Sequence, residues 1–218
     1  MSSNKRPWPT KDAMQQIYEQ HFWGGKDYDF YSGEGSHQPE IIKPYFEVVS
    51  GFLKSHKNKL TVCDLGCGDF NIGKHLFEYT QKYIAVDIVE SLILRNIEIF
   101  KANNLEFHCL DISKDELPKA DCIILKQVLQ HLSNEEIKSI VKKLSNYKYM
   151  ILTEHLPMGN FTPNKNKIAS QGIRLKQNSG VDLLAEPFNL KVKSTTVLDE
   201  FILNQNKGKI VTTIIELH

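Results

Sequence analysis

Two glycines that directly follow an apolar run are the residues best suited to chemistry. Residues 62–68 read VCDLGCG, so the run ends near Asp64 and the chain then passes through Gly66, Cys67 and Gly68. Glycine is needed where a strand turns tightly into a helix, because the backbone bends sharply there and approaches a ligand without a Cβ in the way. The pattern predicts a ligand-binding turn at the tip of a buried strand.

A second acidic residue, Asp87, closes the next apolar run and is followed by Ile88. It lies 21 residues after Gly66, a spacing that places its carboxylate at the end of the neighbouring strand, within reach of both ribose hydroxyls of an adenosine. This geometry serves a nicotinamide dinucleotide and S-adenosylmethionine alike. Asn71 stands where the dinucleotide fingerprint needs a small residue, and the Asp64 carboxylate suits an ammonium group better than a pyrophosphate. The balance favours S-adenosylmethionine.

A third carboxylate, Asp111, closes a third run in the segment CLDIS. At the same edge of the sheet it could accept a hydrogen bond from an adenine amino group, with Leu110 and Ile112 against the ring. A helix cap or a solvated loop residue is the alternative interpretation of this aspartate.

Three residues beyond later apolar runs are candidates for moving a proton. Methyl transfer from a sulfonium is an in-line displacement that depends largely on positioning, but a hydroxyl acceptor must also lose a proton, best to a group with a pKa near neutrality. His131 and His155 are the predicted bases, and Glu154 is predicted to bind substrate or to hold His155 in one tautomer. Either histidine could instead bond a loop carbonyl.

The first 55 residues and the polar segment 156–180 stand outside the strand pattern and are expected to cover the site. Gly33 and Gly35, with the serines beside them, could cradle the carboxylate of the cofactor, and the aromatic side chains could roof the site. The alternative for residues 1–55 is an ordered arm packed on the domain. The alternative for Arg174, in the late polar segment, is a surface or helix-capping role. The predicted contacts are Tyr31 and Ser36 for the cofactor, and Trp23, Tyr28 and Arg174 for the acceptor, the arginine pairing with a phosphate or carboxylate.

Short apolar runs alternate with segments of helical spacing from residue 60 onward. Ser133 and Glu136 form a capping-box signal at the start of one of these helices. Alternation with short connections predicts an α/β fold with a doubly wound, mostly parallel sheet, closed by an antiparallel C-terminal hairpin. The expected strands are 60–65, 82–88, 105–110, 120–125, 149–153, 192–203 and 209–217, the last two joined by a turn at 205–208; the expected helices are 73–80, 91–103, 134–144 and 181–185. We expect one domain over 1–218, with a helical or lid segment at 1–55, a cofactor-binding core at 56–155, and a substrate loop and closing strands at 156–218.

The composition is that of a globular chain of 218 residues, of which 41% are hydrophobic and 24% charged. A net charge of +1 argues against nucleic acid as a partner. The four cysteines lie in or beside apolar runs, as buried thiols of a cytosolic protein do. With no secretory signal, membrane span or metal-ligand cluster in view, we expect a cytoplasmic monomer or homodimer that binds a small-molecule acceptor, and no metal, nucleic acid or membrane.

The order of the motifs DLGCG, VD, LDIS, DCIILKQVLQHL and ILTEH resembles the class I, Rossmann-like, S-adenosylmethionine-dependent methyltransferases over residues 60–155. The resemblance implies a seven-stranded, three-layer α/β/α fold with S-adenosylmethionine as its cofactor. Phe70 departs from the family pattern, which has a third glycine there. The resemblance also implies that Asp64, Gly66, Cys67 and Gly68 contact the methionyl part, Asp87 the ribose and Asp111 the adenine, and that Lys126 and Gln127 line the methionyl and substrate side.

The leading hypothesis is O-methylation of a small polar acceptor, such as a sugar or sugar nucleotide of a surface-polysaccharide pathway. The tetrapeptide Asn/Asp-Pro-Pro-aromatic, typical of methyltransferases that modify base amino groups, does not occur in the sequence after the fourth strand. Three alternatives stay open: an N-methyltransferase of a small amine, a nicotinamide-dependent oxidoreductase, and a catalytically silent S-adenosylmethionine-binding protein.

Overall fold

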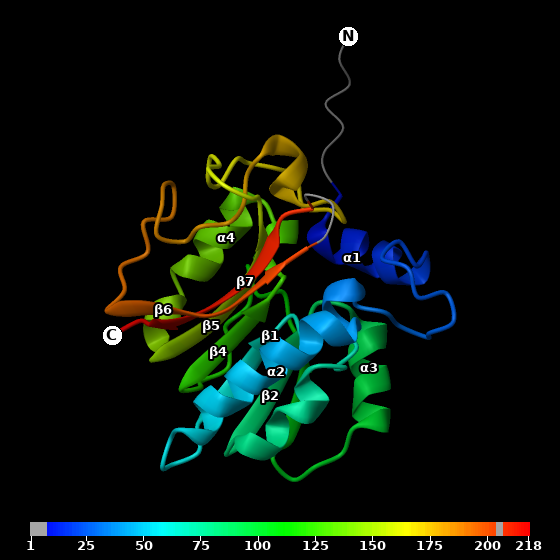
Figure 1. Ribbon diagram of the computed structural model, residues 1–218. Coiled ribbons are helices and arrows are strands. Elements are labelled where there is room, and N and C mark those ends of the chain that lie inside the picture. The colour runs from blue at the N-terminus through cyan, green and yellow to red at the C-terminus, as the bar shows by residue number, and fades with distance from the viewer. Residues whose placement is uncertain (1–7, 204–206) are drawn as a thin grey trace.

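Seven strands form one mixed sheet in the computed structural model, which describes residues 8–203 and 207–218 (Figure 1). The strand order is β3-β2-β1-β4-β5-β7-β6; the first five strands in sequence run parallel, and β7 runs antiparallel to both β5 and β6. The predicted sheet with its closing hairpin is therefore confirmed. The strands are β1 (Thr61–Leu65), β2 (Lys82–Asp87), β3 (Leu105–Cys109), β4 (Cys122–Lys126), β5 (Tyr149–Leu156), β6 (Ser194–Ile202) and β7 (Lys209–Glu216).

The central strand β1 marks the point where the order of the strands reverses. It pairs with β2 on one side and with β4 on the other. In an open parallel sheet such a reversal leaves a crevice beyond the carboxyl ends of the strands, because the connections on either side leave in opposite directions. Asp64 near the end of β1 and Asp87 at the end of β2 are thereby brought to the same edge.

Helices and loops cover both faces of the sheet, which gives the three expected layers (Figure 1). On one face α2 (Pro39–Lys54) and α3 (Glu90–Ile99) contribute Val49 and Ile93 to the core. On the other face α4 (Asn134–Val141), which begins with the predicted capping box, packs together with the chain after β5. The remaining elements are α1 (Thr10–Glu19) and the 3-10 turns η1 (Glu34–Ser36), η2 (Gly73–His75), η3 (Phe77–Tyr79), η4 (Leu129–His131), η5 (Leu144–Asn146) and η6 (Arg174–Gln177).

Two of the predicted helices are wrong, in segments that the structure describes completely. Residues 73–80 form the turns η2 and η3, because Phe70 adopts a φ of +62° and its buried ring fills the space beside Gly73. Residues 181–185 are irregular: Val181 and Leu183 enter the core, and the Asn164 amide bonds both the N–H and the C=O of Asp182 (2.9 and 2.6 Å). Tertiary packing overrides helical spacing in both places. Within the predicted turn at 205–208, residues 205 and 206 lie outside the described residues.

Two segments reach over the carboxyl edge of the sheet: the arm, residues 20–38, and the late loop, residues 157–193. Figure 1 shows α1, which leads into the arm, and the yellow part of the late loop at the same end of the molecule. They meet where the Gln171 side chain donates a hydrogen bond to the Phe22 carbonyl. None of the helices among the described residues combines the length and apolarity that a membrane crossing requires.

Candidate active site

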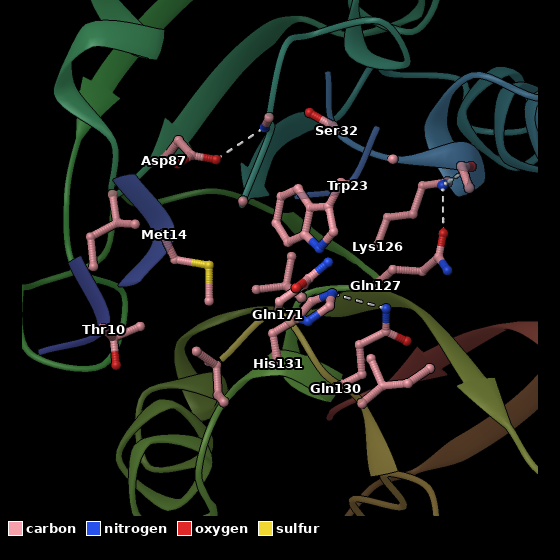
Figure 2. Close-up of a pocket in the computed structure, with 18 of the residues that line it drawn as sticks. Thr10, Met14, Trp23, Ser32, Asp87, Lys126, Gln127, Gln130, His131 and Gln171 are labelled. Carbon is pink, nitrogen blue, oxygen red and sulfur yellow. Dashed lines mark hydrogen bonds between the residues drawn. The ribbon is translucent and has the colours of Figure 1, made fainter. Parts of the chain in front are cut away.

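A cavity of about 680 Å³ opens at the carboxyl ends of β1, β2 and β4, beneath the arm and the late loop (Figure 2). We distinguish two parts of its wall. The glycine end consists of Gly66, Cys67, Gly68, Asp87, Ile88, Leu110, Asp111 and Ile112. The amide end consists of Trp23, Gln127, Gln130, His131 and Gln171.

Asp87 holds the glycine turn in place. Its Oδ2 accepts a hydrogen bond from the Gly68 N–H (3.0 Å), and its Oδ1 accepts one from the Val89 N–H (3.1 Å). Burial raises the pKa of this carboxyl, and the two backbone hydrogen bonds partly offset the rise. Each oxygen still has a lone pair for a ligand, and the residue lines the cavity. Asp87 can therefore bind two hydroxyl groups while it fixes the turn.

The turn itself requires glycine at two positions. Gly66 has a φ of +89°, and a Cβ there would lie 2.4 Å from Val128 Cγ2. Gly68 has a φ of +56°, and its Cβ would lie 2.2 Å from Ser32 Oγ. A larger residue at either position would be strained in its backbone and would displace the neighbouring wall.

Asp64 and Lys126 carry opposite charges at the ends of adjacent strands. Asp64 is 5% exposed and turned into the protein, where it accepts a hydrogen bond from the Tyr83 hydroxyl (2.8 Å), and burial raises its pKa to about 7. Lys126 lines the cavity and donates to the Gly35 carbonyl (2.6 Å) and to Gln127 Oε1 (3.2 Å). Burial lowers its pKa to about 8, and the charge of Asp64 opposes that shift. Lys126 is thus the charge of this pair that a ligand can reach.

Asp69 fastens the arm to the glycine turn. Its Oδ2 accepts from the Ser32 N–H (3.0 Å) and lies 2.5 Å from His37 Nε2, while its own N–H donates to Ser32 Oγ (2.8 Å). Arg95 adds a forked ion pair with Asp29 of the arm (2.7 and 3.1 Å). The arm is therefore ordered against the domain, and through Ser32 it also forms part of the cavity wall.

The amide end is built from segments that are distant in the sequence. Figure 2 shows Trp23 of the arm at the centre of the cavity, above His131, with ring centroids 5.2 Å apart. Gln127 follows β4 with a φ of +57°, an uncommon conformation that is held by the bond from its N–H to the Thr153 carbonyl (2.7 Å). Gln130 places its amide beside His131 Nε2 (3.2 Å). The side-chain amide of each glutamine at this end makes one or two hydrogen bonds within the protein and has further donor or acceptor capacity for a ligand.

His131 is held as a neutral ring. Its Nδ1 lies 3.3 Å from the Ser170 carbonyl and its Nε2 lies 3.2 Å from Gln130 Nε2, so the hydrogen-bond network assigns the proton to Nδ1. Burial, together with the charge of Lys167, lowers the pKa of His131 to about 4. A ring with such a pKa is a weak proton acceptor at neutral pH.

Comparisons with known proteins agree with this geometry. Residues 63–147 match a family model described as a methyltransferase domain. The fold is similar to that of N-methyltransferase NodS from Bradyrhizobium japonicum WM9 in complex with S-adenosylhomocysteine (TM-score 0.67, 10% identity, 95% of this chain and 100% of that one). It is also similar to magnesium protoporphyrin IX methyltransferase ChlM from Synechocystis PCC 6803 with bound S-adenosylmethionine (TM-score 0.58, 16% identity, 98% and 100%). Residues 63–147 therefore resemble a methyltransferase domain, and the whole chain has the fold of the S-adenosylmethionine-dependent methyltransferases to which it is similar.

One curated methyltransferase is related in sequence as well. The chain is 28% identical over 120 residues to malonyl-[acyl-carrier protein] O-methyltransferase of Acetivibrio thermocellus. The match covers 53% of this chain and 40% of that protein, so the chain spans less than half of that relative.

The glycine end fits the predicted cofactor, S-adenosylmethionine. Two glycines leave room where a Cβ would close the wall, Asp87 offers two acceptors for ribose hydroxyls, and Ile88, Leu110 and Ile112 supply an apolar surface for a base. Asp111 is largely occupied, because its oxygens accept from the Ser113 N–H and hydroxyl and from Lys114 (3.0, 2.6 and 2.7 Å). The described residues contain no group of three or more His, Cys, Asp or Glu side chains arranged to hold a metal ion.

The cavity brings together most of the predicted site residues, and six lie outside its wall. Tyr31 stacks on His37 within the arm (4.2 Å between ring centroids), and Tyr28 is 52% exposed. His155 Nε2 bonds the Lys207 carbonyl (2.6 Å), the loop-carbonyl role that the sequence left open. The residues in the wall are Trp23, Ser36, Gly66, Cys67, Gly68, Asp87, Ile88, Leu110, Asp111, Ile112, Lys126, Gln127 and His131; those outside it are Tyr28, Tyr31, Asp64, Glu154, His155 and Arg174.

Glu154 and Arg174 are turned away from any acceptor in the cavity. Arg174 is 2% exposed, and its guanidinium donates to backbone carbonyls and to Asn134. Glu154 is 3% exposed, and neither carboxylate oxygen has a hydrogen-bond partner of standard geometry among the described residues. Burial raises the pKa of Glu154 to about 8, against the opposing effect of the Arg174 charge. The structure therefore does not support direct substrate binding by Arg174.

Sequence reasoning missed several wall residues. Met14 and Tyr18 of α1 line the cavity, and the only local signal for them is the apolar spacing of one helix face. Gln171 of the late loop also lines it, in a polar segment with no periodicity at all. These contacts join segments more than 100 residues apart in sequence, which local patterns do not report.

Proposed function

We propose that this protein transfers the methyl group of S-adenosylmethionine to a hydroxyl group of a small polar acceptor, such as a sugar or a sugar nucleotide. The observation that carries the proposal is the amide end, where three glutamines and Trp23 line the cavity beside the glycine end. An aromatic ring packs against the C–H face of a sugar, and amides donate to and accept from its hydroxyls. Lys176, exposed at the rim of the cavity, suits a phosphate-bearing acceptor.

In this proposal the residues of the chain bind, orient and shield the reactants. Bound S-adenosylmethionine supplies an electrophilic methyl group on a positively charged sulfur. Asp87 and the glycine turn bind the cofactor, the amide end orients the acceptor, and the arm, fastened through Asp69, excludes water. Correct orientation of two reactants can contribute about 7–11 kcal/mol to lowering a barrier.

We assign His131 an orienting role in this reaction. A hydroxyl acceptor must lose its proton, yet the pKa of His131, lowered to about 4, makes the ring a weak base. Its Nε2 also faces the Gln130 amide. We propose that His131 and Gln130 together hold the acceptor hydroxyl toward the methyl group, and that the proton leaves by solvent at the cavity mouth.

The low pKa of His131 favours a second candidate, an N-methyltransferase of a small amine. A neutral amine attacks through its own lone pair and loses its proton afterwards, so it needs less help from a base. The low pKa of His131 therefore counts for this candidate, and NodS, to which the fold is similar, is an N-methyltransferase by name.

Acceptor pools distinguish these candidates. The protein is incubated with S-adenosylmethionine and, separately, with neutral sugars, sugar nucleotides and small amines, and S-adenosylhomocysteine and methylated products are measured by mass spectrometry. We expect an O-methylated sugar or sugar nucleotide. An N-methylated amine would establish the second candidate instead. Binding of S-adenosylhomocysteine with no product from any pool would contradict both and indicate a silent binding protein.

A further inference from the structure

The turn η4, which carries Gln130 and His131 into the amide end, is enclosed by the late loop. All four carbonyls from Leu129 to Leu132 accept hydrogen bonds from that loop. Arg174 Nη1 donates to the Leu129 and Gln130 carbonyls (3.3 and 3.2 Å), and Nη2 donates to the Leu132 carbonyl (2.8 Å). The His131 carbonyl accepts from the Ser170 N–H (3.1 Å) and from Lys167 Nζ (2.9 Å).

Arg174 is the centre of this arrangement. Besides the three carbonyls of η4 and its flank, its Nε donates to the Lys165 carbonyl (2.9 Å) and its Nη2 to Asn134 Oδ1 (2.9 Å). One buried side chain thus joins the late loop, η4 and the first residue of α4. A guanidinium has five N–H donors in a rigid plane, and burying it is costly unless they are satisfied. The surroundings of Arg174 meet that condition with five hydrogen bonds, which indicates a site built around the arginine.

Glu154 of β5 lies on the other side of the same turn. The backbone amides of Leu129 and Gln130 act on its carboxyl group, as does the charge of Arg174. The turn therefore has a cation at its carbonyl side and a carboxyl group at its amide side. Peptide dipoles favour this placement, because amide hydrogens attract negative charge and carbonyl oxygens attract positive charge.

We infer that Arg174 is a positioning residue for the acceptor: it acts through η4 to hold Gln130 and His131 in the orientation that the amide end requires. Its guanidinium lies outside the cavity wall, so it affects the acceptor only through the turn. The Gln130 side chain depends on this position twice, since it bonds His131 Nε2 and also accepts from the His155 N–H (3.2 Å). The effect of Arg174 on the acceptor rests on the proposed function. The effect of Arg174 on the position of η4 does not depend on that proposal.

The test compares two arginine-to-lysine variants. Arg174→Lys keeps the charge and removes the planar fork, whereas Arg95→Lys makes the same change in α3, at the ion pair with Asp29 of the arm. Hydrogen exchange is measured at the amides of residues 129–132, together with calorimetric affinity for S-adenosylhomocysteine and the KM and kcat for the acceptor. For Arg174→Lys we expect exchange at these amides to rise about tenfold, corresponding to about 1.4 kcal/mol of lost hydrogen bonding. The acceptor KM should rise with it, while the affinity for S-adenosylhomocysteine stays near that of the parent.

Arg95→Lys should leave exchange at residues 129–132 unchanged. Unchanged exchange at these amides in Arg174→Lys would overturn the inference, as would a rise that is equal throughout the chain, since that indicates general destabilisation. If Arg174→Lys does not fold, Lys167→Gln removes one donor to the His131 carbonyl, and a smaller rise confined to the same amides is expected; no rise overturns the inference. Because exchange is measured without an acceptor, it decides this point even if no acceptor is methylated.

Discussion

The two ends of the cavity treat charge in opposite ways. At the glycine end, the Asp87 carboxylate faces the cavity while it fixes the turn. At the amide end, the charged side chains of Arg174 and Glu154 are turned into the protein, and neutral amides, an indole and an uncharged imidazole face the cavity. The end that we assign to the cofactor thus presents a charge, whereas the end that we assign to the acceptor buries two of the charges that surround it.

The two ends also differ in how the chain builds them. The glycine end is a strand tip bent by two residues of positive φ, so its geometry comes from a few consecutive residues. The amide end is assembled from the arm, η4 and the late loop, and it keeps its shape only through contacts between them. We therefore expect substitutions at the glycine end to act on cofactor affinity, and those at the amide end to act on the acceptor.

Asp87→Ala should have the largest effect. It removes two acceptors for ribose hydroxyls and also releases the Gly68 and Val89 amides. We expect affinity for S-adenosylhomocysteine to fall by about 1–3 kcal/mol, measured by calorimetry. Asp87→Asn, which keeps the shape and part of the bonding, should lose less. Parent-like affinity in the alanine variant would contradict the assignment of this carboxylate to the cofactor.

Gly68→Ala should weaken cofactor binding by a somewhat smaller amount. The new Cβ would meet Ser32 Oγ, and the left-handed backbone costs about 1–2 kcal/mol for a residue with a side chain. We expect roughly tenfold weaker binding of S-adenosylhomocysteine. Gly51→Ala is the matched control, because a Cβ at that position of α2 meets nothing within 4 Å; it should bind normally. Equal losses in both variants would show that the turn has no special requirement.

His131→Ala should act on turnover and leave cofactor affinity unchanged. It removes the ring that Gln130 bonds and that Trp23 contacts, and we expect kcat to fall several-fold, in line with about 1 kcal/mol for a neutral hydrogen bond. His155→Ala should change kcat less, because its ring bonds the Lys207 carbonyl instead of facing the cavity.

The pH–rate profile sharpens the same point. Because the pKa of His131 is lowered to about 4, this residue should not cause any change of the rate between pH 6 and 7. The pH–rate profile of His131→Ala should therefore have the same shape as that of the parent in this range. If the parent shows a rise in rate between pH 6 and 7 that the variant lacks, His131 would act as a general base after all.

The last prediction concerns the buried carboxyl group of Glu154 and the stability of the fold. Burial raises the pKa of Glu154 to about 8, above the value of about 4.5 usual for glutamate. Between these two pH values the folded protein keeps a proton on this carboxyl group that the unfolded chain has lost. The free energy of unfolding should therefore fall as pH rises from about 4.5 to 8. In Glu154→Gln this pH dependence should be shallower, measured by urea unfolding at pH 5 and pH 8. A slope identical to that of the parent would place the Glu154 pKa near its ordinary value.

Local sequence determined the glycine end and most of the sheet. The two glycines and Asp87 could be read directly, because a tight turn and the next strand tip each follow from a few adjacent residues, whereas Asp64, predicted to contact the cofactor, is turned into the protein toward Tyr83. Even here the structure added a detail: Phe70, at the family's third glycine position, adopts the glycine-like φ of +62° and is stabilised by edge-on packing against Tyr83, Phe100 and Phe107. That packing also replaced the predicted helix at 73–80 by two short turns.

Only the tertiary structure decided the amide end. A histidine and a glutamate near strand ends suggest catalysis and an arginine in the late loop suggests acceptor binding when they are read locally, but which way each side chain points depends on partners far along the chain. Arg174 faces η4 because its guanidinium bonds the late loop, η4 and the start of α4, and His131 is uncharged because the late loop buries it. Burial and long-range hydrogen bonding set the orientation and pKa of a side chain, and neither is encoded within the few residues on either side of it.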